Sequence, residues 1–194
     1  MKKGLIVIVA IVAVIAILGG SIVSSYNGLV DKQANVENAD AQIQVQLVRR
    51  ADLIPNLRNT VHAYAGYEED VFTALADARA KLYAATNPQT AATPEHYKEA
   101  IDSYDYAMSR LLVVVENYPE LKADKNFIAL QDELAGTENR IAVARKDYND
   151  AATEYNKSIK KFPTVIFAGM LGFDEAELFE ASDNAQNVPV VDFE

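Results

Sequence analysis

The stretch "KNFIALQDELAGTENRIAVARKDYNDAATEYNKSIKKF", residues 125–162, decides the fold because its apolar side chains recur at helical spacing. Bulky residues return every seven positions, at Phe127, Leu134, Ile141, Tyr148, Tyr155 and Phe162. Mostly smaller residues follow three positions later, at Leu130, Thr137, Ala144, Ala151 and Ser158. This double stripe predicts one helix of about 57 Å that packs closely against its neighbours. Asp124 is its expected N-cap, and Pro163 is expected to end it.

Three other segments carry apolar stripes of the same period, at about 26–50, 53–84 and 94–117. The last of them opens with Thr93 as N-cap and Pro94 in the first turn. Four helices with short connections predict an all-α fold, an elongated antiparallel (up-down) four-helix bundle over residues 26–162. A short irregular and acidic tail, residues 163–194, is expected to follow.

The stretch "RRADLIPNL", residues 49–57, leaves two structures open. A proline inside a helix removes one hydrogen bond, which costs about 3 kcal/mol. In a hairpin Asp52 would instead cap a new helix with Pro55 in its first turn. The seven-residue spacing of Leu47, Ile54 and Val61 favours one kinked helix. We favour the hairpin, because a helix over residues 26–82 would run about 85 Å.

The N-terminal stretch Gly4 to Val23 contains no charged residue and spans about 30 Å as a helix, the thickness of a bilayer core. Lys2 and Lys3 precede it, so the positive-inside rule places residues 1–3 in the cytoplasm. A single-pass anchor in the cell membrane, with the rest of the chain extracytoplasmic, is therefore predicted. A cleaved signal peptide is the alternative.

The net charge of −10 argues against nucleic acid as a partner, since phosphates would repel the chain. The absence of cysteine excludes disulfides, a thiol nucleophile and cysteine metal sites. Residues 163–194 hold seven acids and no lysine or arginine. An oligomer formed through the anchor stays open, because Gly19 and Gly20 offer a small contact without a full GxxxG motif.

Phe162 to Phe173 is an uncharged, largely apolar segment that is too short to span a bilayer. In an up-down bundle whose first helix leaves the membrane, the fourth helix returns to it. The segment is therefore expected to touch the bilayer surface or a membrane partner. The side chains proposed for this contact are Val165, Ile166, Phe167, Met170, Leu171 and Phe173. A cap that seals the bundle end is the alternative, and the nearby acids favour a protein partner over deep insertion.

Several motifs together resemble the LemA family of bacterial membrane-anchored proteins: "YNGLV", "VQLVRRADLIPNL", "ENYPELKADKNFIALQDELAGTENRIAVARKDYNDAATEYN" and "FPTVIFAGMLGF". The resemblance implies one transmembrane helix and an elongated helical bundle, and it implies no settled activity. Its signature falls on Arg49, Arg50, Asp52, Leu53, Pro55, Asn56, Leu57, Glu116, Asn117, Tyr118, Pro119, Glu138, Asn139, Arg140, Arg145, Tyr148 and Asn149.

These signature residues have two readings: caps and salt bridges between helices, or a binding surface. The alternation of an up-down bundle places "RRADLIPN" and "NYPELKAD" together at the membrane-distal end, which makes that end the candidate for partner contact. No metal, cofactor or catalytic motif surrounds His62 or His96. The prediction is a non-enzymatic scaffold or adaptor that binds envelope proteins. A ligand-binding sensor that relays through a partner membrane protein is the alternative.

Overall fold

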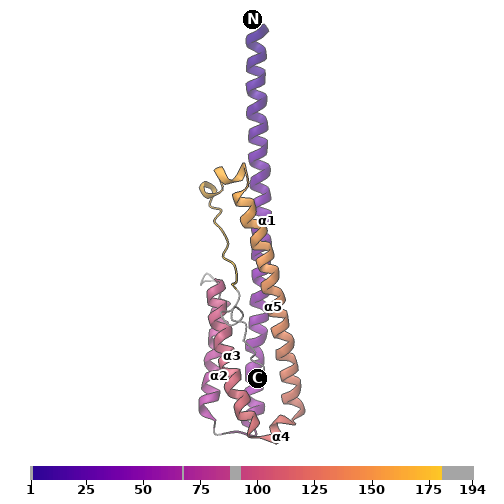
Figure 1. Ribbon diagram of the computed structural model, residues 1–194, viewed down its shortest axis with the longest axis vertical. Helices are drawn as coiled ribbons and strands as arrows, with labels where there is room; N and C mark the ends of the chain where they lie inside the picture. Colours follow the sequence, from indigo (N-terminus) through magenta and orange to yellow (C-terminus); the bar gives the residue numbers. More distant parts are fainter. Residues whose placement is uncertain (1, 67, 88–92, 181–194) are drawn as a thin grey trace, which may run out of the picture.

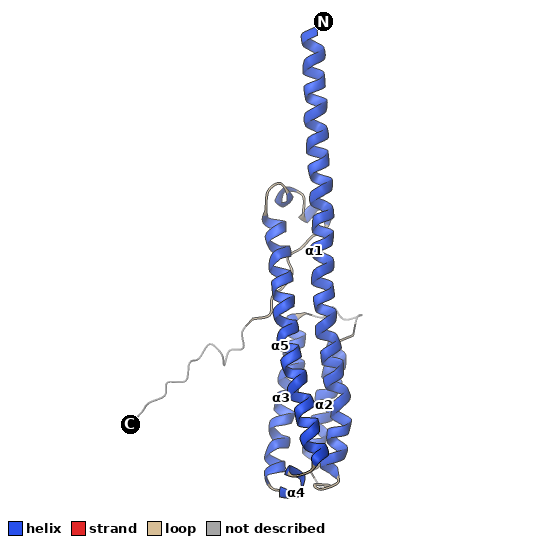
Figure 2. Ribbon diagram, turned by 90° about the vertical axis from the view of Figure 1, so that its right-hand side faces the viewer, coloured by secondary structure: helices blue, strands red, loops and turns tan. Residues whose placement is uncertain are grey.

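The computed structural model describes residues 2–66, 68–87 and 93–180, and these residues form helices and no strand (Figure 1, Figure 2). The α-helices are α1 (Lys2–His62), α2 (Glu69–Ala85), α3 (Pro94–Glu116), α4 (Pro119–Lys122) and α5 (Lys125–Lys160). Two 3-10 turns follow, η1 (Thr164–Ile166) and η2 (Gly169–Leu171). The predicted all-α class, with a long apolar N-terminal helix, is confirmed.

The first part of α1 projects alone beyond the other helices (Figure 1). By length and composition it is suited to cross a membrane. Every described side chain from Gly4 to Ser24 is exposed, and Ser25 is the first half-buried one. The helical body therefore begins two residues after the uncharged stretch ends at Val23.

The favoured break at residues 49–57 is wrong, because α1 continues through Pro55 to His62. The buried residues Leu47, Ile54 and Val61 keep one packing register across the proline. The length argument also fails, since only residues 25–62 need a covering helix, and about 57 Å matches the length of α5. Pro55 itself faces a hollow against Ala76 and Ala80 of α2. The predicted helices 26–50 and 53–84 are thus replaced by α1 and the shorter α2.

The first reversal of the chain lies at residues 63–68 instead. Tyr64 and Ala65 donate backbone hydrogen bonds of 3.0 and 2.9 Å to the carbonyl of Val61 as the helix ends. Glu68 then stands at the N-cap position of α2, and Glu69 and Asp70 occupy its first turn. Acids there interact favourably with the positive end of the helix dipole. Glu68 stands where an apolar residue is due in the stripe of this part of the chain, because a helix starts there; that stripe comprises Leu57, Val61, Tyr64, Val71, Leu75, Ala78 and Leu82.

The helices associate as two antiparallel pairs, α1 with α5 and α2 with α3, and α2 also packs on α1. The α2–α3 pair lies along the parts of α1 and α5 farthest from the apolar N-terminal end, here called the distal half, and α4 closes the distal end (Figure 1, Figure 2). The body is therefore four helices thick only in its distal half. Nearer the apolar end, α1 and α5 continue as a two-helix stalk.

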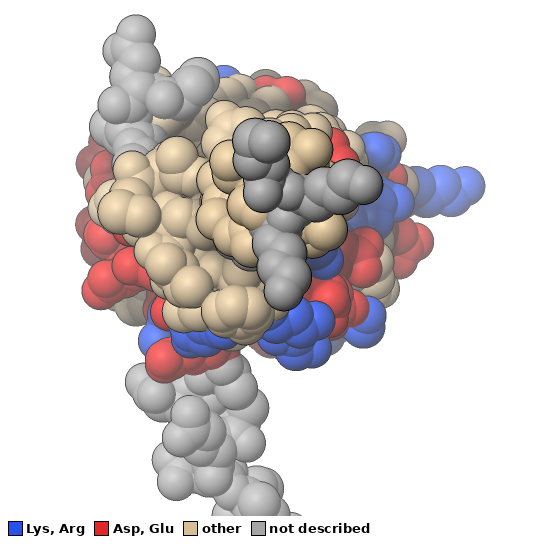
Figure 3. Space-filling model, turned by 90° about the horizontal axis from the view of Figure 1, so that it is seen from above, with Lys and Arg blue, Asp and Glu red and all other residues tan. Residues whose placement is uncertain are grey.

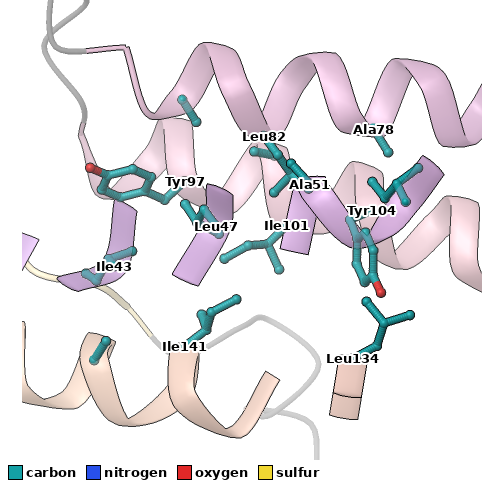
Figure 4. Close-up of a cluster of buried hydrophobic side chains, with 14 of the residues drawn as sticks. Ile43, Leu47, Ala51, Ala78, Leu82, Tyr97, Ile101, Tyr104, Leu134 and Ile141 are labelled. Atoms are coloured by element: carbon teal, nitrogen blue, oxygen red, sulfur yellow. The ribbon is translucent and has the colours of Figure 1, made fainter. Parts of the chain in front are cut away.

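The core of the distal half combines side chains from all four long helices (Figure 4). α1 contributes Leu47 and Ala51, α2 contributes Leu82, and α3 and α5 contribute Ile101 and Ile141, each at most 6% exposed. Burial of such aliphatic side chains contributes roughly 1.5–3 kcal/mol each. This layer helps to hold the two pairs together.

The predicted stripe of α5 is buried through its first five bulky members, from Phe127 to Tyr155. The companion stripe shifts by one position toward the end of the helix, where Ala152 and Ile159 are buried. An α-helix drifts by about 20° per heptad relative to a strict seven-residue repeat, which accounts for the shift. Phe162 is 81% exposed, because α5 ends at Lys160 and the stripe no longer applies.

After η2 the chain turns back at Gly172, whose φ of 80° lies in the left-handed region that glycine tolerates. Residues 173–180 then run along the stalk without regular secondary structure, toward the α2–α3 pair (Figure 1). We call residues 173–180 the strap. The remaining acids of the predicted tail, Asp183, Asp192 and Glu194, lie outside the described residues.

Candidate functional site

The signature stretch of α1 distributes its side chains to the three other long helices. Arg49 donates from Nε to Glu133 of α5 at 2.9 Å, and Arg50 pairs with Glu138 of the same helix. Asp52 accepts a hydrogen bond from the hydroxyl of Tyr83 on α2. The stretch therefore links helices within the distal half of the body, short of its end. The prediction that it lies at the distal end is wrong, because α1 does not break there.

Arg50 is the most deeply buried charge among the described residues, with 1% of its surface exposed. Its guanidinium carbon lies 4.4 Å from the ring centroid of Tyr104 on α3. Burial lowers the pKa of Arg50, and burial also raises the pKa of Tyr104 to about 12. Nε and Nη1 of Arg50 are buried without a hydrogen-bond partner. This interior position suits a structural link between α1, α3 and α5.

Arg49 and Arg140 converge on one carboxylate at the exposed outer side of the α1–α5 pair. Glu133 accepts from Arg49 and, at 3.3 Å, from Nη2 of Arg140. A groove of about 330 Å³ adjoins this cluster. It is lined by Gln42, Gln46, Asn139, Arg140, Val143, Ala144 and Asp147. We call Arg49, Glu133 and this groove the arginine face.

The second signature motif, Asn117 to Pro119, lies at the distal end and apart from the arginine face. Asn117 is the C-cap of α3 and donates from Nδ2 to the carbonyl of Val113 at 3.3 Å. Pro119 begins the single turn α4, whose Leu121 is fully buried. The hydroxyl of Tyr64 reaches Asp124 at 3.0 Å across this end. These residues act as caps and turns.

The remaining signature residues occupy different surroundings. Asn56 is exposed, and its carbonyl accepts a 2.9 Å hydrogen bond from Thr60. Asn139 and Arg140 lie on the arginine face, whereas Glu138 pairs with Arg50 while its own side chain stays 54% exposed. The structure thus brings Arg49 and Arg140 together on Glu133, and Asn139 lines the adjoining groove. It does not bring them near Asn117, Tyr118 or Pro119.

Two asparagines of α5 hold the strap by its main chain. Asn149 donates from Nδ2 to the carbonyl of Phe179 and accepts from its N–H, both at 2.9 Å. Asn156 forms the same pair with Ala176, at 2.8 and 2.9 Å. Seven helical residues advance about 10.5 Å, and three extended residues advance about 10 Å. The two spacings match, so the two asparagines, seven positions apart on α5, bind two strap residues that are three positions apart.

Phe179 anchors the far end of the strap in an aromatic pocket. Its ring stacks on Tyr97 at 6.0 Å between centroids and meets the edge of Tyr148 at 5.3 Å. The guanidinium carbon of Arg145 lies 4.9 Å from the same ring. The hydroxyl of Tyr97 donates to Asp40 of α1 at 2.9 Å. The signature residues Arg145, Tyr148 and Asn149 therefore bind the strap.

The apolar segment after α5 divides into an exposed and a buried set. Four of the six predicted contact residues are exposed: Val165, Ile166, Met170 and Leu171. Phe167 and Phe173 are 9% and 6% exposed, so these two predictions are corrected: both pack against the body. Phe162 was omitted from the prediction, although it is the most exposed of the group at 81%. We call Phe162, Val165, Ile166, Met170 and Leu171 the apolar tip.

Sequence reasoning also missed Glu133, Asn156 and Tyr97 as contact-forming residues. The seven-residue spacing of Asn149 and Asn156 on a predicted helix was a usable signal, because it places two amides on one face. Among the described residues no group of three or more His, Cys, Asp or Glu side chains is arranged to hold a metal. His62 packs its ring 5.5 Å from that of Phe72.

Fold and contacts together define an all-helical protein in which one unbroken helix joins an apolar segment of membrane-spanning length to a helical body. The chain belongs to the LemA family, whose sequence profile matches residues 39–193. The family resemblance read from the signature motifs is confirmed.

Similar proteins carry two kinds of name. Magnetosome proteins MamQ 2 and MamQ 1 of Paramagnetospirillum magneticum are each 26% identical over 206 residues, covering 96% of this chain and 75% of the relative. Protein LemA of Metamycoplasma hominis is 28% identical over 157 residues, covering 81% of this chain and 69% of the relative. These likenesses extend over most of the helical body.

Proposed function

We propose that this chain is a non-enzymatic, membrane-anchored scaffold or adaptor that binds a protein partner of the cell envelope. The uncharged start of α1 supports single-pass anchoring in the cell membrane. Lys2 and Lys3 support a cytoplasmic N-terminus with the body outside. Anchoring restricts a partner search to the membrane surface, which suits a binding role.

The arginine face is the observation that carries the proposal. Arg49 and Arg140 share the single carboxylate of Glu133, so their two guanidinium groups have donors left for a further acceptor, although Asp147 in the same groove balances the local charge. An exposed ion pair contributes only about 0.2–1 kcal/mol to stability, so folding alone gives little reason for this arrangement. Arginine is enriched at protein interfaces, where its planar group binds carboxylates in pairs of hydrogen bonds.

The shape of this face fits a helix as partner. The groove runs between two antiparallel helices, and the aliphatic side chain of Val143, which lines it on α5, is 58% exposed. A partner helix laid between two helices buries such residues in the manner of a helix in a groove. We therefore propose an amphipathic partner helix with an acidic residue facing Arg49 or Arg140.

Photocrosslinking in cells tests the proposal. A photoreactive amino acid replaces Val143, and as a matched control it replaces Val113 of α3, which is 68% exposed. Adducts of one defined mass are expected from position 143 only, and the R49Q/R140Q pair should remove them without changing thermal unfolding. Equal adducts at both positions, or adducts that persist in the R49Q/R140Q background, would refute this binding face.

A further inference from the structure

The apolar tip presents five large apolar side chains to solvent on one short segment. Their exposed fractions range from 47% at Leu171 to 81% at Phe162. The segment 162–173 contains no charged residue. Seen from the N-terminal end, uncharged surface occupies the centre of the molecule and charged side chains lie toward its edge (Figure 3). Clusters of exposed apolar side chains on a protein surface mark contact sites.

The base of the tip is fixed, so the exposed set points outward from an ordered support. Thr164 and Ala168 are 7% and 1% exposed, and Phe167 and Phe173 are also buried. Ala168 donates its N–H to the carbonyl of Thr164 at 2.9 Å, and Phe173 donates to that of Ala168 at 3.1 Å. The buried half of the segment therefore holds the other half at the end of the stalk.

The position of the tip along α1 indicates what covers it. The ring of Phe173 meets the edge of Tyr26 with 5.5 Å between centroids, and η1 also contacts α1. Tyr26 follows Val23, the end of the uncharged stretch, by about 4.5 Å of helix rise. The headgroup layer on each side of a bilayer is about 5–7 Å thick. If residues 4–23 span the membrane, the tip lies in that layer.

Charge around the tip is balanced. Residues 154–175 contain three lysines, Lys157, Lys160 and Lys161, and three acids, Glu154, Asp174 and Glu175. Lys160 pairs with Glu175 at 2.7 Å. Attraction to anionic headgroups is therefore not the basis of a contact here, and burial of apolar surface is.

We propose that the apolar tip is a second lipid contact, seated in the interfacial layer beside the spanning part of α1. This inference rests on the proposed anchoring of α1. One spanning helix leaves the body able to tilt and to rotate about the helix axis. A second contact, displaced from that axis, fixes which side of the body faces the bilayer, and with it the height and direction of the arginine face.

The chain lacks tryptophan, so one introduced tryptophan reports one position. The full chain is reconstituted into phosphatidylcholine vesicles with lipids brominated on their acyl chains, which quench nearby indoles. M170W reports the tip, V113W on α3 is the control in the body, and I15W is the reference inside the spanning stretch. Met170 and Val113 are similarly exposed, at 78% and 68%.

The expected result is that brominated lipid lowers M170W fluorescence by about twofold or more, because its aromatic ring would sit at the membrane interface. V113W should stay unquenched. The quenching should persist at high salt. M170W quenched no more than V113W would overturn the lipid contact. A blue-shifted but unquenched M170W, which indicates cover by protein or a second copy, would also overturn it. Failure to quench I15W would instead reject the anchoring on which this proposal rests.

Discussion

Arg50 of α1 lies with its guanidinium carbon 4.4 Å from the ring centroid of Tyr104 on α3, in the centre of the four-helix region. Glu138 of α5 pairs with the same guanidinium, whereas Nε and Nη1 of Arg50 lack hydrogen-bond partners. Only Arg50 is buried, since Glu138 is 54% exposed, and an ion pair often returns less than the desolvation of a buried charge costs. Arg50 therefore serves to specify which helices meet, more than to increase the free energy of unfolding.

The first prediction follows from this incomplete compensation. R50M keeps the volume and removes the buried charge, so unfolding free energy should change by less than about 1 kcal/mol, or increase. R50A leaves a cavity and should cost about 2–4 kcal/mol. Chemical denaturation in detergent micelles measures both. Equal losses in the two variants would show that the charge itself stabilises the fold. R49M, an exposed-pair control, should stay within about 1 kcal/mol.

Pro55 gives the second prediction. It lies inside α1, where its ring removes a hydrogen bond to the carbonyl of Ala51. P55A should restore that bond and raise the unfolding free energy by on the order of 1–2 kcal/mol, after allowance for lost packing on α2. Thermal unfolding by circular dichroism checks this. A destabilised P55A would mean that the proline ring is needed in the hollow against Ala76 and Ala80.

Pro55 also shows where reading the sequence succeeds and fails. The stripes on α3 and α5 and the uncharged N-terminus are local periodicities, and they identified long helices and an apolar first helix. Whether the chain turns at Pro55 could not be predicted, because two effects oppose each other there. The free-energy cost of a proline inside a helix favours a break, whereas the packing of Leu47, Ile54 and Val61 favours one continuous helix. Packing prevailed, and the true reversal took place where Glu68 interrupts the stripe.

The third prediction concerns the strap. N149A and N156A each remove two hydrogen bonds to strap main chain, so each should weaken strap binding by about 1–3 kcal/mol. Hydrogen exchange of the N–H groups of Ala176 and Phe179 should accelerate, while unfolding of the helical body changes little. N139A, an exposed asparagine on the same helix, should leave exchange in the strap unchanged. If hydrogen exchange of these N–H groups stayed slow in the N149A/N156A double variant, the aromatic pocket alone would hold the strap.

The strap could not have been predicted, since its contacts depend on two segments meeting in space. Taken alone, the acids and apolar residues of "DEAELFEA", which begins at Asp174, are typical of one or two helical turns. In the structure Phe173, Ala176 and Phe179 face the body instead, one residue in three. The match to the seven-residue step of Asn149 and Asn156 is visible only once α5 and the strap lie side by side.

Asp124, the N-cap of α5, gives the last prediction. The N–H of Phe127, the Tyr64 hydroxyl and the N–H of Asn126 all donate to its carboxylate, which lowers the pKa of Asp124. A lowered pKa in the folded state means that the charged form stabilises the fold above the ordinary aspartate pKa. This stabilisation is lost as pH falls through the folded-state pKa.

D124N keeps the capping oxygen without the charge, so its stability should fall less steeply in acid than that of the parent chain. Unfolding midpoints measured from about pH 6 to pH 3 test this, with D132N on the exposed side of α5 as control. An acid dependence as steep in D124N as in D132N would place the sensitivity at other carboxylates.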